Sequence, residues 1–138
     1  MSDRTNEFVA TLRISSELLR ASQIAEILGH EPTSSFEKGD PASKRSPKSG
    51  CRKGSAWLLK STLPRSEPLK EHVSQLLAFA QEKEAALLQL KSRCHIDIFC
   101  GLFFAGGGGG FCLAASDAGE LARLGIDLDL DIYAWNDE

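Results

Sequence analysis

Two stretches of this chain alternate apolar and polar residues with a period of two, the pattern of a β-strand that buries one face. IDLDLDIY (126–133) alternates Ile and Leu with Asp. CHIDIFCGLFF (94–104) opposes two sets of residues, with Cys94, Ile96, Ile98 and Cys100 on one side and His95, Asp97 and Phe99 on the other. Successive side chains of a strand point to opposite faces of its sheet. The chain is therefore expected to fold around a sheet that is covered on one face only.

Further segments supply strands and helices in a regular order. Strands are predicted at EFVATLRI (7–14), GSAWLLKST (54–62) and FCLAAS (111–116). Helices are predicted over 15–29 with Ser16 or Ser22 as N-cap and Gly29 as the stop, from Ser66 to Leu90 with a bend or break at QEKE (81–84), and from Ser116 or Asp117 as cap to Gly125. The order β-α-β-α-β-β-α-β resembles a split βαβ arrangement with an added helix. We predict an α+β fold, in which two to four helices cover one face of a mainly antiparallel five-stranded sheet.

The length and the charge distribution indicate one domain with a distinct basic segment. A chain of 138 residues has the size of a single domain, residues 1–138. Residues 30–54 contain three of the five prolines and no apolar period, which predicts a long loop, with residues 37–54 as a flexible segment. Residues 38–53 carry six Lys or Arg against one Asp, although the whole chain has a net charge of −3. A basic loop on an acidic body follows.

The stretch LFFAGGGGGFCLAAS (102–116) contains five consecutive glycines. A phosphate-binding loop requires a Lys and a Ser or Thr after its glycines at the start of a helix. Here the glycines are followed by Phe111 and Cys112. The pattern predicts a loose hairpin turn, in which glycine adopts positive φ without steric cost, and no nucleotide cofactor.

No arrangement of residues reaches the specificity of a metal or catalytic signature. Cys94, His95, Cys100 and Cys112 include no C-x₂-C pair, and adjacent Cys94 and His95 point to opposite faces of a strand. Neither G-x-S-x-G nor H-E-x-x-H occurs. We therefore expect no metal, no cofactor and no catalytic residue. Reduced thiols, an N-terminus without the pattern of a signal peptide and the lack of a long apolar run predict a cytoplasmic protein with no membrane contact.

Several short motifs resemble a known family. They are Ile24 to Gly29 followed by Glu31-Pro32-Thr33, then Lys38-Gly39-Asp40, Ser55-Ala56-Trp57 and the terminal Leu-Gly-Ile-Asp-Leu-Asp-Leu-Asp-Ile-Tyr. Together they resemble the bacterial family known as domain of unknown function 4279, over nearly the whole chain. The lysine-rich segment between Asp40 and Ser55 and the five-glycine turn look like local departures. The resemblance implies no established reaction.

The sheet face away from the helices is the candidate site. Period-two counting assigns eight residues to it: His95, Asp97, Phe99, Asp127, Asp129, Asp131, Tyr133 and Trp135. Aromatic rings among carboxylates suit a basic protein partner, so we expect a non-enzymatic binding module, of the immunity-protein type by analogy. The open alternative is a small hydrolase or ligand-binding enzyme that uses His95, Asp97 and Asp129. Carboxylates that only keep the sheet solvated and unassociated are the plainest alternative.

Nucleic-acid binding is disfavoured, because the basic segment lacks interleaved aromatic residues and lies on an acidic body. A homodimer is compatible with the sequence. Trp57 has apolar residues on both faces of its strand, so the sequence assigns it neither to the core nor to the surface, and the order of the strands also stays open.

Overall fold

The computed structural model describes residues 5–43, 48 and 50–135, which form nine helices and strands. In chain order these are β1 (Glu7–Ser16), α1 (Ala21–Leu28), β2 (Ser34–Phe36), β3 (Ser55–Lys60), α2 (Leu69–Glu82), α3 (Glu84–Leu90), β4 (His95–Ala105), α4 (Ala115–Leu124) and β5 (Asp127–Trp135). None of the helices within these ranges is long and apolar enough to cross a membrane.

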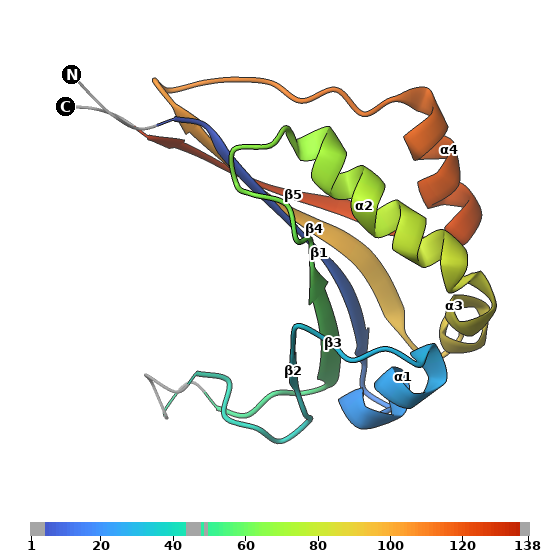
Figure 1. Ribbon diagram of the computed structural model, residues 1–138. Helices are drawn as coiled ribbons and strands as arrows, with labels where there is room; N and C mark the ends of the chain where they lie inside the picture. The colour runs from blue at the N-terminus through green and yellow to red at the C-terminus, as the bar shows by residue number, and fades with distance from the viewer. Residues whose placement is uncertain (1–4, 44–47, 49, 136–138) are drawn as a thin grey trace.

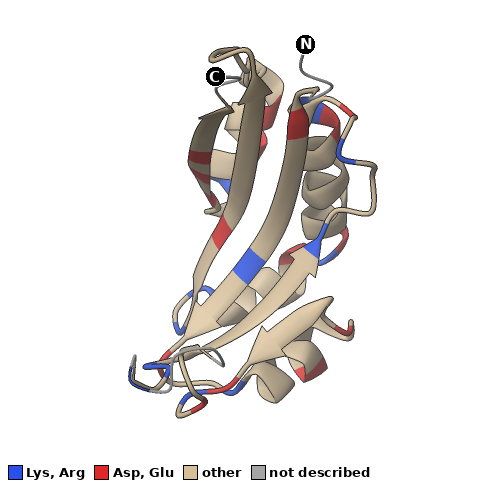
Figure 2. Ribbon diagram, turned by 90° about the vertical axis from the view of Figure 1, so that its left-hand side faces the viewer, with Lys and Arg blue, Asp and Glu red and all other residues tan. Residues whose placement is uncertain are grey.

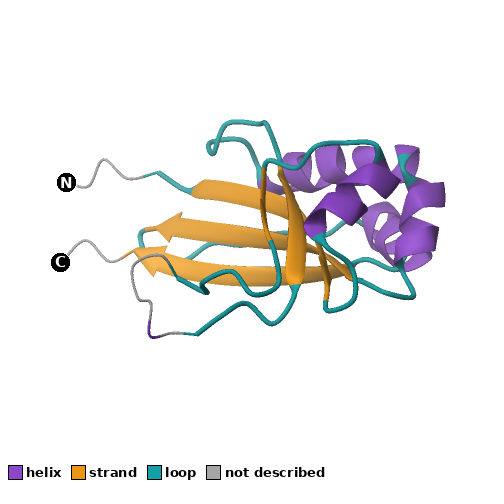
Figure 3. Cartoon of the chain, turned by 90° about the horizontal axis from the view of Figure 1, so that it is seen from below, coloured by secondary structure: helices purple, strands orange, loops and turns teal. Residues whose placement is uncertain are grey.

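The strands form one sheet in the order β2-β3-β1-β4-β5, with the helices on one side of it (Figures 1 and 3). The first four strands pair antiparallel in the arrangement of a split βαβ unit, because β3 lies between β1 and β2. β5 runs parallel to β4, since α4 carries the chain back along the helix layer before β5 begins. The predicted α+β class and the five-stranded sheet are confirmed, and the sheet is mixed.

The core lies between the sheet and the helices, and Trp57 is part of it. This side chain is fully buried and stacks on Phe79 of α2, with the ring centroids 6.0 Å apart. Its Nε1 donates a hydrogen bond to the backbone oxygen of His30 at 3.0 Å, which satisfies the polar atom of a buried indole. Trp57 therefore belongs to the core.

The predicted strand at 111–116 is wrong, and so is the hairpin turn before it. The chain turns at Gly106 and Gly107, which have φ values of 77° and 88°, and leaves the sheet for the helix layer. Phe111 and Leu113 alternate with polar or small residues because they pack against the core from this crossing segment. The fifth strand is instead β2, three residues long, inside the segment predicted to be a loop.

Helix ends depart from the predictions more than helix positions do. α1 begins at Ala21, because Ser16 ends β1 and its Oγ accepts hydrogen bonds from the backbone N–H groups of Leu18 and Leu19 at 3.0 and 2.9 Å. α2 begins after Pro68 and not at Ser66, and α4 begins after Ala114, so that Ser116 and Asp117 lie inside its first turn. The predicted break is confirmed where α2 gives way to α3 at Lys83, and Gly29 ends α1 with a left-handed φ of 66°.

The basic segment is partly ordered by backbone pairing. An isolated antiparallel bridge joins Pro41 to Cys51, and the backbone N–H of Arg52 donates to the backbone oxygen of Asp40 at 2.7 Å. The predicted flexible segment, 37–54, falls partly on residues 44–47 and 49, which lie outside the described residues. Its flexibility stays a prediction.

Candidate functional site

The register of β4 and β5 brings the eight predicted residues to one face. Asp97 pairs with Asp127, Phe99 with Asp129, Phe103 with Tyr133 and Ala105 with Trp135. Paired residues of neighbouring strands share a face, and this one is opposite the helices. Figure 2 looks at the side without helices and shows the acidic positions of β4 and β5 next to a basic position on β1. We call the eight residues, together with Arg13 and Phe103, the acidic face.

Arg13 of β1 forms the centre of the acidic face. Its Nε and Nη2 donate to the two carboxylate oxygens of Asp97 at 2.8 and 2.5 Å, and Nη2 also lies 3.3 Å from Asp129. The guanidinium carbon is 4.4 Å from the centroid of the Phe99 ring, within the range of a cation–π contact. The Asp97 side chain is only 3% exposed, although it lies on the face of β4 that the helices do not cover. The arginine therefore closes over a carboxylate at the middle of the sheet.

Sequence reasoning missed the role of Arg13. The signal was present, because Arg13 opposes the apolar residues of its strand and had to lie on the uncovered face. What the sequence did not reveal was that β1 and β4 are neighbours, which pairs Arg13 with Asp97.

The two carboxyl groups beside Arg13 have pKa values shifted in opposite directions. Burial would raise the pKa of Asp97, but the hydrogen bonds and the charge of Arg13 more than offset burial, so its pKa lies below the ordinary value. The neighbouring Asp97 carboxyl raises the pKa of Asp129, whose side chain is about half exposed. The acidic face also carries more carboxylates than arginines, because Asp97, Asp127, Asp129 and Asp131 lie on it with Arg13.

Within the part of the chain that the structure describes, His95, Asp97 and Asp129 are the residues best placed to hold a cation. One ligand atom from each lies within 4.8 Å of the other two. His95 Nε2 is 3.9 Å from Asp97 and 3.6 Å from Asp127, and its side chain is 60% exposed. Arg13 already donates to both oxygens of Asp97, so a metal ion would have to compete with a bidentate ion pair.

Aromatic rings occupy the other end of the acidic face. Phe103 stacks on Tyr133 with ring centroids 4.9 Å apart and on Trp135 at 5.8 Å. The guanidinium carbon of Arg65 lies 5.2 Å from the Phe103 ring. The Tyr133 hydroxyl donates a hydrogen bond to Asp131. Sequence reasoning assigned Tyr133 and Trp135 to this face but did not include Phe103, the ring that joins them.

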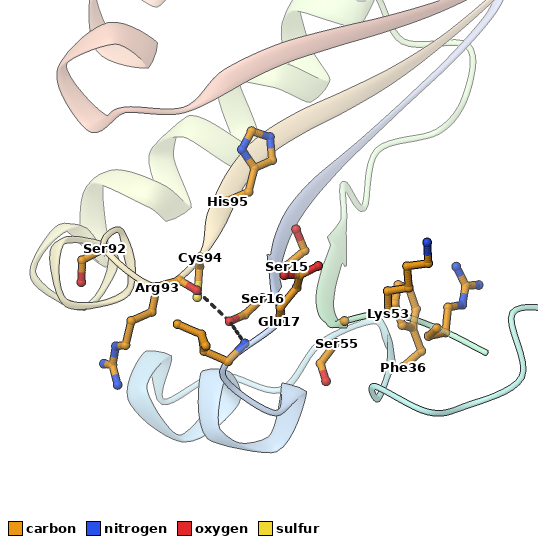
Figure 4. A pocket seen from close by; sticks show the side chains of 13 residues that line it. Ser15, Ser16, Glu17, Phe36, Lys53, Ser55, Ser92, Arg93, Cys94 and His95 are labelled. Carbon is orange, nitrogen blue, oxygen red and sulfur yellow. Dashed lines mark hydrogen bonds between the residues drawn. The ribbon is translucent and has the colours of Figure 1, made fainter.

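Two cavities adjoin the end of the acidic face that contains His95. One, of about 350 Å³, lies over the sheet and is lined in part by Arg13, His95 and Asp97. The other, of about 670 Å³, lies beyond the end of β1 (Figure 4). In its wall the Ser16 hydroxyl donates to the backbone oxygen of Arg93 at 2.7 Å. The larger cavity contains cationic side chains together with the carboxylate of Glu17, so it has no single charge.

The cysteines lie outside this chemistry. All four are free thiols, and Cys100 is buried on the core side of β4. Burial, with the nearby Asp97 and Asp129, raises the pKa of the Cys100 thiol to about 12. Burial also raises the pKa of Cys94. Both thiols are protonated at neutral pH, which disfavours them as nucleophiles.

Comparison with protein families places the chain. The family model described as Domain of unknown function (DUF4279) matches residues 6–135. The chain belongs to this family. The DUF4279 resemblance drawn from the short motifs is thereby confirmed over nearly the whole chain. No curated protein and no solved structure matches this DUF4279 protein.

Proposed function

We propose that this protein is a non-enzymatic binding module whose acidic face takes a basic segment of a partner protein. The observation that carries the proposal is the alternation along β5, which places Asp127, Asp129, Asp131, Tyr133 and Trp135 on one uncovered face. Carboxylates select a basic partner and speed its approach, while aromatic rings supply contact area.

The protein's own arginines support this choice of partner. Arg13 lies over Phe99 while bonded to Asp97, and Arg65 lies over Phe103 while paired with Glu7 at 2.6 Å. Each places a guanidinium between a ring and a carboxylate. Asp131 and Tyr133 offer a similar pair of groups at the outer part of the same face, where an Arg or Lys of a partner would bind.

The setting of the module is part of the proposal. The four free cysteines support a cytoplasmic location, because reducing compartments keep thiols unpaired. An immunity-protein role, in which an acidic face covers a basic toxin, is one form of this function and rests on analogy.

The test reverses charges on the acidic face and leaves Arg13, Asp97 and Asp129 unchanged. In Asp127→Lys/Asp131→Lys, both changes lie on β5, whereas the control Glu26→Lys/Glu82→Lys makes the same change of charge on exposed positions of the helix layer. A partner is captured by cross-linking, identified by mass spectrometry and produced pure. We expect the β5 variant to bind it at least about tenfold more weakly and the control to bind it as the wild type does. Equal binding by all three proteins would rule out the acidic face as the site.

A small hydrolase or ligand-binding enzyme is the second candidate. The observation that favours it is the convergence of His95, Asp97 and Asp129 beside a cavity of about 350 Å³. It predicts turnover of chromogenic carboxylic or phosphate esters, with or without added Zn²⁺ or Mg²⁺, and loss of that turnover in His95→Gln. Stoichiometric zinc in untagged protein would also favour this candidate, and inactivity under all these conditions would exclude it.

A further inference from the structure

The outer edge of β5 is one of the two edges of the sheet, and the other belongs to β2, which has only three residues. β5 is nine residues long and is the last strand in the sheet order, paired only with β4. Among the described residues, no backbone hydrogen bond from outside the β4–β5 pairing reaches residues 127–134 of this strand. Unpaired N–H and C=O groups along an extended strand are a template for a further strand.

The two faces of this edge have opposite chemistry. The acidic side bears Asp127, Asp129 and Asp131, whereas the helix side bears Leu130, Ile132 and Ala134. Leu130 is 44% exposed and Ile132 is 59% exposed, because α4 covers only the beginning of β5.

A shallow apolar cavity accompanies these exposed side chains. It has a volume of about 250 Å³ and is lined by Leu130, Ile132 and Ala134 together with residues 107–111 of the segment between β4 and α4. In Figure 1 that segment runs above the end of the sheet before it reaches α4. The apolar side of the edge is thus left uncovered at Leu130 and Ile132.

We infer that the partner binds by adding a β-strand to the edge of β5, and that this strand alternates basic with apolar residues. The inference rests on the proposed function and gives it a binding mode. Side chains of the added strand would alternate between the two faces. Those beside Asp129 and Asp131 would be Lys or Arg, and those beside Leu130 and Ile132 would be apolar, so that one strand satisfies both faces and the backbone edge.

A second copy of this chain fits the same edge poorly. Two β5 strands related by a twofold axis would place their Asp residues on the same face of one continuous sheet. Like charges that lie opposite each other on paired strands are destabilising. The carboxylates of β5 therefore oppose pairing with a second copy of β5 and favour a strand with basic residues. The same side chains thus protect the edge from self-association and select the partner.

A designed peptide tests the inference directly. The probe is a short peptide that alternates lysine and valine, and its controls are a peptide of the same composition with the residues in two blocks and an alternating peptide with N-methylated backbone amides. We expect the alternating peptide to bind, as measured by calorimetry, and to protect β5 amides from hydrogen exchange. Both controls should bind at least about tenfold more weakly. Equal binding of the N-methylated peptide would overturn strand addition.

A pair of variants separates this inference from the proposed function. Ile132→Lys alters the apolar side of the edge, and Leu88→Lys makes the same change at a 64% exposed position on α3. We expect only Ile132→Lys to weaken the alternating peptide by about tenfold, with folding checked by circular dichroism. If Ile132→Lys binds normally while Asp127→Lys/Asp131→Lys does not, strand addition is wrong and the acidic face stands. If sedimentation shows a dimer that Ile132→Lys dissociates, a second copy occupies the edge and the inference fails.

Discussion

Arg13 and Asp97 are 84 residues apart in the chain and form a two-pronged ion pair across the β1–β4 pairing, at 2.8 and 2.5 Å. The Asp97 side chain is buried, whereas that of Arg13 is 37% exposed. A carboxylate in this position depends on its partner, because burial without compensation is costly. The pair holds the middle of the acidic face in place.

We predict that Arg13→Leu destabilises the protein by about 2 kcal/mol, because it leaves Asp97 buried without a cation. This value is below the range for fully buried pairs, since solvent screens the exposed arginine. Urea unfolding followed by circular dichroism measures the loss. Arg65→Leu, which breaks the exposed pair with Glu7, is the matched control and should cost about 0–1 kcal/mol. If both variants lost the same stability, the ion pair with Asp97 would have no special role.

Trp57→Ala should cost about 3–5 kcal/mol, because it empties a large volume in a core that cannot fully collapse. It also leaves the backbone oxygen of His30 without the indole N–H that bonds to it. Thermal and urea unfolding measure the effect. Leu88→Ala removes an apolar side chain that is 64% exposed and should change stability by less than about 0.5 kcal/mol. An unchanged melting temperature in Trp57→Ala would contradict the packing of the core.

Strands with one buried face were predictable, and strand neighbours were not. β1 and β4 carry period-two patterns because the helix layer covers one side of each, and β5 carries the same pattern although α4 covers only its beginning. A local alternation of this kind can be recognised in the sequence. β2 was missed, since three residues carry too little pattern and its existence depends on pairing with β3. The strand prediction at 111–116 was wrong because a loop that crosses the core can also alternate residues that contact the core with residues that do not.

The same distinction applies to the candidate site. The face of each residue follows from local alternation, so the eight predicted residues lie together once β4 and β5 pair. Arg13 and Phe103 complete the site through long-range neighbours. Their contacts depend on strand order, and a single sequence does not encode strand order in any local pattern.

His72 predicts a loss of stability in mild acid. Burial lowers its pKa below the ordinary value of 6.5, although backbone oxygens of Glu67 and Pro64 partly oppose this. The unfolded chain therefore binds a proton more readily than the folded one, so the stabilising contribution is complete above about pH 6.5 and is lost as the pH falls below that value. The stabilising contribution of Asp97 is lost only at a lower pH, because its pKa lies below the ordinary value of 3.8.

Urea unfolding at about pH 7.5 and about pH 5.5 measures this effect. The difference in unfolding free energy between the two pH values should shrink in His72→Gln. Leu88→Ala, which alters an exposed residue without an ionisable group, is the control and should retain the wild-type difference. A difference that survives in His72→Gln would assign the acid sensitivity to other groups.

The five glycines are predicted to be unequal. Gly106 and Gly107 have positive φ, which side chains with a Cβ adopt at a cost, so Gly106→Ala and Gly107→Ala should each destabilise the protein by about 1 kcal/mol. Gly108 and Gly110 have φ outside that region and open space where the Cβ of an alanine would lie, so alanine there should be neutral or slightly stabilising. Thermal melting of the four variants tests the order, and equal effects at all four positions would contradict the observed turn.

Trypsin should cut first inside the basic segment, after Lys44, Arg45 or Lys48. The residues before and after these positions are held by backbone hydrogen bonds. The N–H of Gly39 donates to the backbone oxygen of Arg52 at 2.9 Å, and the N–H of Ala42 donates to that of Gly50 at 2.9 Å. Backbone that is held in hydrogen bonds resists a protease, whereas loop tips rich in small and polar residues are the usual sites of first cleavage. Brief digestion followed by mass spectrometry of the fragments locates the cut. A nicked protein that keeps its circular dichroism spectrum would support 37–54 as the most flexible internal segment, and a first cut between residues 66 and 91 would contradict it.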